Sequence, residues 1–378
     1  MGTLALHSGR TNLSLWVLKD DTSSRRVVQI FSRHVADSHF TTITSGSVLH
    51  EHEPCWPAIA KTWKNQIDTF ANLGFRVIAP DMPGYGRTSA RKKIEDYSLE
   101  SINIAMAAML DHVGQEAAIW IGHDWGCGAV WSFAEHYPER TIAVAGLAVP
   151  SHVIEKGLEE ELKTVNRDTY PEDQYPYGQW DYQRFYQVNF EKATSWFDSD
   201  IAACVRAFYA KGSPASLGKP AFTANVQKDG GWFGGLEKPD PAWKQIPIEA
   251  TCIDEDIYKD LVEAMERTSF YGADAWYANH ETNRKYFFEK AKNDGYLHMP
   301  TLFIHARYDT ICDTFTSSLA EPGRKFCTNL TEASIEAGHW VAQEKPEEVN
   351  QIITRWILES VPQQWPGYWT RGFVKSKV

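Results

Sequence analysis

Short apolar segments alternate with amphipathic segments along most of the chain after residue 47. Four of the apolar segments are rich in valine and isoleucine or flanked by aromatic residues: Arg76–Ala79, Ala118–Ile121, Ile142–Val149 and Thr301–Ile304. They are apolar at successive positions rather than at every second one, which is typical of parallel strands covered on both faces. A further segment, Ala333–Glu336, is expected to form the last short strand.

Helical periodicity separates and follows these strands. Ser101–His112 is amphipathic, and a second helix is predicted to start near Pro346. Its apolar positions recur at i, i+3, i+4, i+7 and i+8: Val349, Ile352, Ile353, Trp356 and Ile357. This spacing gives one apolar helix face. Repeated β-α alternation predicts an α/β protein with an open, doubly wound, mostly parallel sheet.

The alternation stops between Ser151 and about Met299, where aromatic helical patterns and a glycine cluster replace the buried strands. We predict three parts: residues 1–150 and 300–378 form the two halves of the core, and residues 151–299 form a mainly helical lid inserted between them. Before residue 47 the pattern is weak, and Val27–Phe31 and Phe40–Ile43 are the candidate strands there.

Composition narrows the class of protein. The 378 residues are 43% hydrophobic and 23% charged, which excludes disorder along most of the chain. The net charge of −11 argues against nucleic acid and anionic membranes as partners, and no apolar segment is long enough to span a bilayer. Six scattered cysteines without a Cys-x-x-Cys pair indicate reduced thiols, so a cytoplasmic location is expected. The ending Ser376-Lys377-Val378 only half resembles a peroxisomal signal.

The segment after Ala118–Ile121 reads Gly-His-Asp-Trp-Gly and continues into a helical pattern. A strand that runs through glycines into a helix is the layout of a nucleophile elbow, which holds its central residue on a sharp turn. Gly122 and Gly126 flank that residue because a Cβ there would have no room. Serine usually stands at the centre, and here it is replaced by Asp124.

An aspartate at this position changes the reaction class. A carboxylate is anionic at neutral pH and is suited to displacement at an sp³ carbon, which leaves an ester on the enzyme. Water must then hydrolyse the ester, and this step needs a histidine base. The alternative is that Asp124 is only a helix N-cap. The flanking glycines and the two residues described next favour the nucleophile.

An acid and a histidine follow in the order that this layout requires. Asp309 comes soon after the strand Thr301–Ile304, and His339 follows the last predicted strand in Gly-His-Trp. Loops at the carboxyl ends of parallel strands are where active sites form. We predict that His339 is the base and that Asp309 fixes its tautomer and stabilises the imidazolium. Alone, either would be an ordinary loop residue.

Three motifs together resemble the soluble epoxide hydrolases of the α/β-hydrolase fold. They are Gly-His-Asp-Trp-Gly at 122–126, Asp-Met-Pro-Gly-Tyr-Gly at 81–86, and Gly-His-Trp at 338–340 followed by Lys-Pro-Glu-Glu-Val-Asn. The resemblance implies an α/β-hydrolase fold with a lid (cap), an apolar epoxide as substrate and no cofactor. It also implies substrate-binding positions at His123, Trp276 and Trp340.

The resembled family uses two lid tyrosines as hydrogen-bond donors to the epoxide oxygen. Tyr182, in Trp-Asp-Tyr-Gln-Arg-Phe-Tyr, and Tyr277, in Ala-Trp-Tyr-Ala-Asn, match those segments. Ring opening builds negative charge on the leaving oxygen, and two phenols would stabilise it. The alternative is that both belong to an aromatic lid without a catalytic role, since the chain has sixteen tyrosines.

One segment departs from the family pattern. The family carries His-Gly-x-Pro after its third strand, whose backbone N–H groups complete an oxyanion hole, whereas this chain reads His-Glu-His-Glu-Pro at 50–54. The N–H of Trp125 is expected to supply one donor, and Glu51 or His52 the second. The two histidines of this segment also suit a metal, but no second cluster follows at ligand spacing, so no metal is predicted.

The leading prediction is hydrolysis of an epoxide to a vicinal diol through an ester on Asp124. A dehalogenase and an epoxide-opening cyclase with the same layout are alternatives. The tyrosines suit oxygen better than halide, and in a cyclase a substrate hydroxyl would attack instead of water. A non-catalytic binding protein is the alternative from another class, favoured by the altered 50–54 segment. A homodimer is left open.

Overall fold

The computed structural model describes residues 4–8, 11–15, 48–52 and 56–366. A six-stranded sheet lies at its centre in the order β4-β3-β5-β6-β7-β8, with parallel pairing throughout. Its strands are β3 (Val48–His52), β4 (Arg76–Ile78), β5 (Ala118–His123), β6 (Thr141–Leu147), β7 (Thr301–Ala306) and β8 (Leu330–Ile335). Two further strands, β1 (Leu4–Ser8) and β2 (Thr11–Leu15), pair antiparallel.

The predicted strands coincide with β4 to β8, with small shifts at their ends. Strand β6 ends at Leu147 rather than at Val149, because Ala148 has a φ of 69°, in the left-handed region that interrupts extended backbone. Strand β8 begins earlier than predicted, at Leu330. The candidate strands Val27–Phe31 and Phe40–Ile43 lie outside the described residues.

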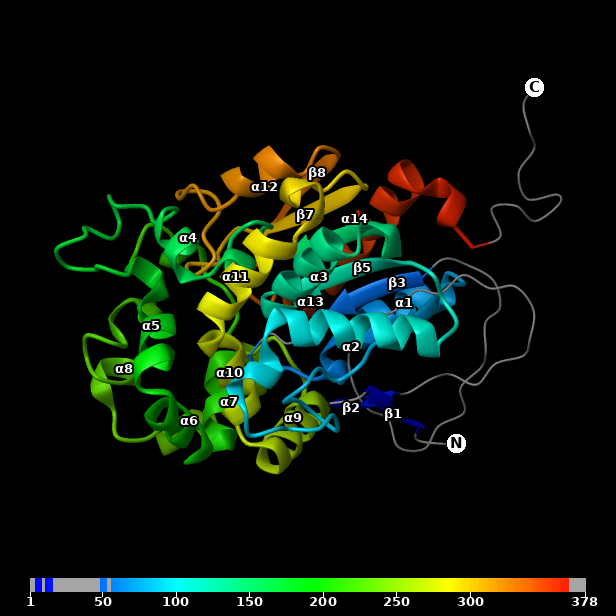
Figure 1. The fold of residues 1–378 in the computed structure, drawn as a ribbon. Helices are drawn as coiled ribbons and strands as arrows, with labels where there is room; N and C mark the ends of the chain where they lie inside the picture. The colour runs from blue at the N-terminus through cyan, green and yellow to red at the C-terminus, as the bar shows by residue number, and fades with distance from the viewer. Residues whose placement is uncertain (1–3, 9–10, 16–47, 53–55, 367–378) are drawn as a thin grey trace, which may run out of the picture.

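Helices cover both faces of the sheet (Figure 1). On one face lie α1 (Lys64–Asn72), α13 (Val341–Glu344) and α14 (Pro346–Ser360), and on the other α2 (Leu99–His112) and α3 (Trp125–His136). Successive residues of a strand point to opposite faces. Ile119 and Ile121 of β5 therefore pack into the core with α14, whereas Trp120 packs into the core with α2 and α3. The doubly wound α/β sheet is confirmed.

Between β6 and β7 the chain forms helices, shown in green to yellow in Figure 1, and we call this segment the lid. Its α-helices are α4 (Leu158–Leu162), α5 (Asp181–Val188), α6 (Phe190–Asp198), α7 (Ile201–Phe208), α8 (Trp232–Gly235), α9 (Glu255–Thr268), α10 (Tyr271–Ala275) and α11 (His280–Lys290). The last α-helix before β8 is α12 (Glu321–Phe326). The exact boundaries after residue 150 and before residue 300 stay a prediction.

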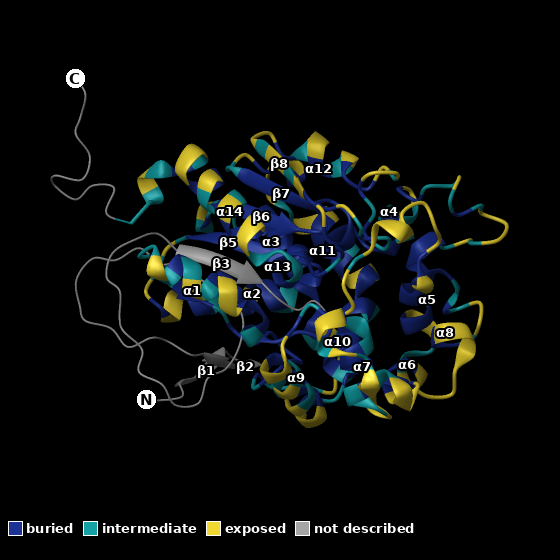
Figure 2. Ribbon diagram, turned by 180° about the vertical axis from the view of Figure 1, so that it is seen from behind, coloured by how far each residue is buried: buried dark blue, intermediate teal, exposed yellow. Residues whose placement is uncertain are grey.

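Aromatic side chains join the lid to the rest of the molecule. Trp56, which precedes α1, lies with its ring 4.3 Å from that of Phe197 and 5.0 Å from that of Phe270. Trp232 lies 5.3 Å from Phe197 in the same cluster. Each large ring removes much apolar area from water. In Figure 2, dark blue marks buried residues in the sheet and in the lid helices alike.

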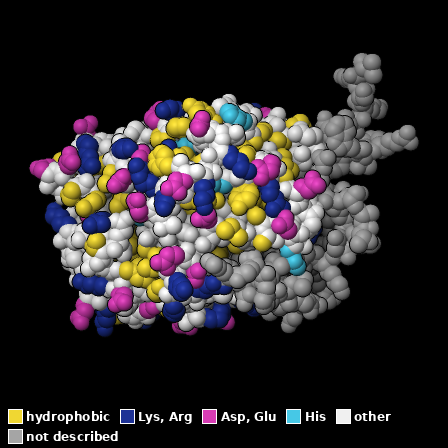
Figure 3. Space-filling view, in the orientation of Figure 1, with side chains coloured by type: hydrophobic (Ala, Val, Ile, Leu, Met, Phe, Trp, Pro, Cys, Tyr) yellow, Lys and Arg dark blue, Asp and Glu magenta, His cyan; other side chains and the backbone are white. Residues whose placement is uncertain are grey.

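The surface is mixed in character. On the face shown in Figure 3, lysine and arginine side chains are interspersed with aspartate and glutamate, and small apolar patches lie among them. Among the described helices, none has an apolar stretch long enough to cross a membrane.

Candidate active site

Asp124 stands on a strained turn between β5 and α3. Its φ is 52° and its ψ is −124°, a conformation that non-glycine residues rarely adopt. Its side chain accepts no capping hydrogen bond from α3, which argues against a simple N-cap role. A Cβ at Gly122 would collide with the carbonyl of Gly126, so the turn requires a glycine there. The predicted elbow geometry is present.

His339 lies between Asp124 and Asp309. Its Nε2 is 3.7 Å from Oδ1 of Asp124, and its Nδ1 is 2.6 Å from Oδ2 of Asp309. The other oxygen of Asp309 accepts the backbone N–H groups of Ile311 and Cys312, each at 2.9 Å. Burial opposes ionisation of Asp309, but the charge and hydrogen bond of His339, with these two N–H donors, hold its pKa below the usual value. The structure thus brings the three predicted residues together.

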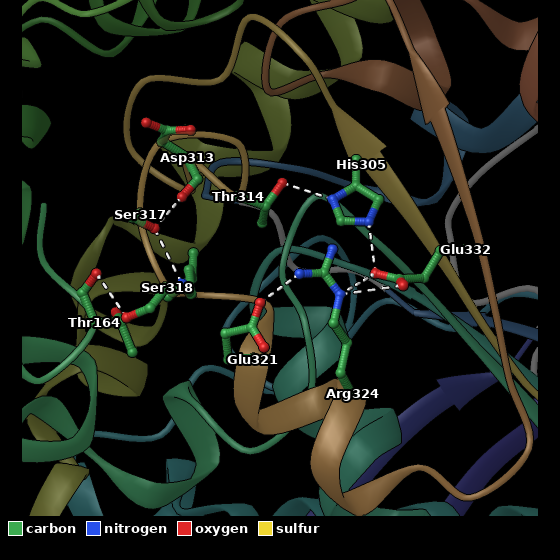
Figure 4. A network of polar contacts seen from close by, with 10 residues as sticks. Thr164, His305, Asp313, Thr314, Ser317, Ser318, Glu321, Arg324 and Glu332 are labelled. Carbon is green, nitrogen blue, oxygen red and sulfur yellow. Dashed lines mark hydrogen bonds and ion pairs between the residues drawn. The ribbon is translucent and has the colours of Figure 1, made fainter.

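The loop that carries Asp309 is tied to its surroundings on two sides (Figure 4). On the sheet side, His305 of β7 bonds Thr314 through Nδ1 at 2.7 Å. On the lid side, the backbone N–H of Ser318 donates to the carbonyl of Thr164 at 3.3 Å. The part of the loop that follows Asp309 is therefore anchored both to the sheet and to the lid.

Tyr182 of α5 and Tyr277, which follows α10, meet above the turn. Their ring centroids are 5.5 Å apart, and the ring of Tyr277 lies 5.2 Å from that of Trp125. Both side chains are almost fully buried. Burial raises the pKa of each phenol well above its usual value, and the negative charge of Asp124 contributes to the rise in both. Both phenols are therefore neutral donors within the electrostatic reach of Asp124.

The three residues predicted to bind substrate have protein partners in the structure. His123 bonds the backbone carbonyl of His339 through Nε2 at 2.6 Å, and the indole of Trp276 donates to the carbonyl of Pro83 at 3.2 Å. The indole of Trp340 donates to the backbone carbonyl of Phe208 at 2.7 Å, and its ring stacks on that of Tyr209, which is also in the lid. All three are buried, and their substrate-binding role stays a prediction.

The segment 50–54, which is expected to contribute to an oxyanion hole, is described by the structure only up to His52. Glu51 and His52 form the end of β3, where they pair with Ile121 and Gly122 of β5, and their role also stays a prediction. The segment 53–55, which includes Pro54, lies outside the described residues. Trp125 is the first residue of α3, so its N–H has no partner within the helix.

Several residues around the site were missed by the sequence reasoning. Asp274 of α10 accepts hydrogen bonds from the Trp56 indole at 2.7 Å and from Thr194 at 2.8 Å. Glu161 of α4 accepts a hydrogen bond from Gln183 of α5 at 2.7 Å. For Asp274 the only signal in the sequence was a polar residue within an aromatic stretch, and for Glu161 there was none, because these contacts join positions far apart along the chain.

Within the part of the chain that the structure describes, two groups of side chains have metal-ligand chemistry. Asp309, Cys312 and His339 form one, and two of these residues belong to the hydrogen-bonded pair already described. Glu135, His152 and Glu155 form the other. In the second group, Glu155 accepts the backbone N–H groups of His152 and Val153, and His152 Nε2 bonds a backbone carbonyl at 2.8 Å. His152 and Glu155 are thus engaged with the backbone, whereas the two carboxylate oxygens of Glu135 have no hydrogen-bond partner among the residues that the structure describes. We assign no metal to either group.

Comparison with known proteins identifies the family. The sequence model of the alpha/beta hydrolase fold matches residues 53–346, and the chain belongs to that family. The bifunctional epoxide hydrolase 2 of Sus scrofa is 30% identical over 324 residues, which cover 84% of this chain and 53% of that protein. Epoxide hydrolase A of Mycobacterium tuberculosis is 28% identical over 308 residues, 80% of this chain and 88% of the relative. The chain spans about half the length of the pig relative.

Solved structures agree on the fold. The structure of epoxide hydrolase A from Mycobacterium thermoresistibile superposes with a TM-score of 0.67 at 23% identity and covers 94% of this chain and 98% of that one. An epoxide hydrolase from Vigna radiata gives a TM-score of 0.68 at 18% identity, with 95% and 98% covered. The predicted resemblance to epoxide hydrolases of this fold is confirmed.

Proposed function

We propose that this protein hydrolyses an epoxide to a vicinal diol through an ester intermediate on Asp124. One observation carries the proposal: His339 stands between Asp124 and Asp309, and two buried phenols in mutual contact lie next to Trp125, the residue that follows Asp124. The names of the curated relatives point to the same reaction.

In the first step, a carboxylate oxygen of Asp124 attacks an epoxide carbon. A new carbon–oxygen ester bond forms, the ring carbon–oxygen bond breaks, and its electron pair goes to the ring oxygen. Tyr182 and Tyr277 donate hydrogen bonds to that oxygen, and one of them transfers its proton to it. Donors that are fixed in place before the charge develops need no reorganisation during the reaction.

In the second step, Nε2 of His339 takes a proton from water, and the resulting hydroxide attacks the carbonyl carbon of the ester. The tetrahedral intermediate collapses, and the ester bond between its carbon and the substrate oxygen breaks. The leaving alkoxide takes the proton of the added hydroxyl, so that the diol leaves and Asp124 returns to a carboxylate. The proton held by the imidazolium restores the phenol. Asp309 keeps Nδ1 of His339 protonated, so that Nε2 is the nitrogen free to act as base.

The tetrahedral oxyanion needs N–H donors. Trp125 supplies one, because its N–H opens α3 without a helical acceptor. As candidates for the second backbone N–H donor we consider Trp56 in addition to Glu51 and His52. Trp56 precedes Pro57, as x precedes proline in the family pattern, and Pro57 is nearer to Trp63 than Pro54 is. The bond from its indole to Asp274 also holds Trp56 in place.

We further propose an apolar epoxide as substrate and a reaction without a cofactor. The apolar character follows from the rings around the two phenols: Tyr182 lies 5.8 Å from Trp232, and Tyr277 lies 4.9 Å from Tyr186. The cytoplasmic location and the homodimer stay predictions.

The test uses two variants and intact-protein mass spectrometry after exposure to styrene, fatty-acid and terpenoid epoxides. His339→Gln is expected to accumulate the mass of one epoxide, localised to Asp124, because the ester forms but water is not activated. Asp124→Asn is expected to gain no mass and to form no diol. An unmodified His339→Gln protein, with every epoxide tried, would contradict the mechanism. Halide release from haloalkanes would instead favour the dehalogenase.

A further inference from the structure

Two polar side chains are buried next to Tyr182, between α5 and α4. Glu161 of α4 and Gln183 of α5 are 0% and 1% exposed. Both helices lie next to each other at the lid end of the molecule (Figure 1). Burying two such side chains in an aromatic lid is unfavourable unless their polar atoms are hydrogen-bonded. Within the described part of the chain, Oε1 of each has no hydrogen-bond partner, so the contacts made by Glu161 Oε2 and Gln183 Nε2 are what offset this cost.

The amide of Gln183 contacts two partners through one nitrogen. Nε2 donates to Oε2 of Glu161 at 2.7 Å and also to the phenol oxygen of Tyr182 at 3.4 Å. An amide nitrogen carries two hydrogens, so both bonds can exist together. The phenol oxygen of Tyr182 then accepts one hydrogen bond and keeps its own hydrogen for another acceptor.

This contact depends on Glu161. Successive residues of a helix point about 100° apart, so Tyr182 and Gln183 do not share a face of α5. Their ends meet only if the amide is turned back toward the phenol, and the bond to Glu161 from a different helix holds it there. Without Glu161, the amide would be free to turn away from Tyr182.

The state of Glu161 suits this role. Burial raises its pKa to about 8, and the negative charges of Glu155 and Asp124 contribute to the rise. Its Oε1 lies 4.0 Å from Nδ1 of His280, the nearest basic group. A neutral carboxyl still accepts the amide hydrogen through Oε2, and it adds no second negative charge beside the nucleophile.

We propose that Glu161 and Gln183 are positioning residues that make Tyr182 the stronger acid of the two lid phenols. This inference rests on the proposed function. As Tyr182 gives its proton to the opened epoxide oxygen, charge grows on the phenol oxygen and the Gln183 hydrogen bond stabilises it. Among the described residues, none donates a hydrogen bond to the oxygen of Tyr277, which holds the epoxide but is not the proton donor.

The test measures ring opening alone. In the His339→Gln background the ester accumulates, so its formation rate can be followed by rapid quench and mass spectrometry. Gln183→Met keeps the length of the side chain and removes the amide. We expect it to slow ester formation about tenfold, the effect of one lost hydrogen bond to a charged group, with little change in the epoxide concentration for half-maximal rate.

A double-mutant cycle separates positioning from a loss of structure. When Tyr182 is already phenylalanine, adding Gln183→Met should change the rate by less than twofold. In the matched Tyr277→Phe background, the same addition should still slow the rate about tenfold, because Gln183 acts through Tyr182 alone. Equal slowing in both backgrounds would overturn the proposal.

Variants of the carboxyl complete the test. Glu161→Gln keeps an oxygen that accepts the Gln183 hydrogen, so ester formation should stay within about twofold of the background rate, whereas Glu161→Leu should match Gln183→Met. A Glu161→Leu protein at full rate would also overturn the proposal. If the His339→Gln background forms no ester with any epoxide, the proposed function has failed, and this is a different result from ester formation that does not depend on Gln183.

Discussion

Two buried aspartates near the site, one on the loop after β7 and one in the lid, have pKa values that are shifted in opposite directions. Asp309, on the sheet side, is 3% exposed, and its hydrogen bonds to His339 and to two backbone N–H groups hold its pKa below the usual value despite burial. Asp274, on the lid side, is 0% exposed, and burial raises its pKa well above the usual value although Thr194 and Trp56 donate to it.

The difference lies in the partners, because the burial is alike. Neutral donors such as an indole and a hydroxyl offset only part of the cost of moving a carboxylate out of water, whereas an imidazole can take up a proton and provide a positive charge. The candidate site therefore has an ionised side, where Asp309 would support the proposed base, and a neutral side, where phenols and carboxyls act as hydrogen-bond partners. The proposed mechanism uses both.

The strongest test of this comparison is the same substitution at each aspartate. Asp309→Asn should lower kcat by roughly 10³–10⁴, because an amide neither fixes the His339 tautomer nor stabilises the imidazolium. Asp274→Asn should lower kcat less than tenfold, since a neutral acid is replaced by a neutral amide. Steady-state diol formation measures both, and comparable losses in the two variants would remove the distinction.

Although Asp274 is expected to matter little for kcat, the stability of the protein should depend strongly on its carboxyl group. Asp274→Ala leaves the Trp56 indole and the Thr194 hydroxyl buried without their acceptor, and should lower the free energy of unfolding by about 3–4 kcal/mol. Asp274→Asn keeps an acceptor and should cost about 1 kcal/mol. Urea unfolding measures both, and equal losses would mean that shape alone matters at this position.

The pH dependence of the free energy of unfolding tests whether His280, which lies near Glu161, is held neutral in the folded protein. Burial lowers its pKa from 6.5 to about 4. Below pH 6.5 the unfolded chain binds a proton that the folded protein refuses, so the free energy of unfolding falls as the pH drops from 6.5 toward 4. The slope is about 1.4 kcal/mol per pH unit, or roughly 3 kcal/mol in total.

The matched variant His280→Gln should lose this part of the slope, as measured by urea unfolding at several pH values. Glu161 provides the opposite control. Its pKa of about 8 is above the unfolded value, so stability falls as the pH rises from 4.5 toward 8, and Glu161→Gln should flatten that limb. A slope unchanged in both variants would show that neither group is held neutral.

The smallest effect is expected at an ion-pair cluster that is partly open to solvent, in which the side chains of Lys61 and Asp260 are 13% and 27% exposed. Lys61 forms ion pairs with Asp256 and Asp260 of α9, and the side chain of Asp256 is 76% exposed. Lys61→Met should lower the free energy of unfolding by no more than about 1 kcal/mol, and less in high salt. A loss as large as that of Asp274→Ala would show that this partly exposed cluster is not screened.

Much of the site could be predicted from local sequence. A strand that ends in Gly-His-Asp-Trp-Gly specifies its turn within a few residues, so the position of Asp124 on a sharp turn could be predicted. The order of Asp309 and His339 along the chain supported the assignment. Tyr182 and Tyr277 came from a resemblance rather than from periodicity. The hydrogen bond between Trp56 and Asp274 spans 218 positions, and no local pattern indicates such a contact.

The sequence alone determined the strands β4 to β8, where the sharp turn falls and which carboxylate it presents, because hydrophobic periodicity and glycine conformation act over neighbouring residues. Only the tertiary structure decided which acids are ionised and which are neutral. Desolvation and hydrogen-bond partners depend on what packs around each group, and packing joins helices and strands that are distant along the chain. Asp309 and Asp274 are the same residue type, and their surroundings alone make them different acids.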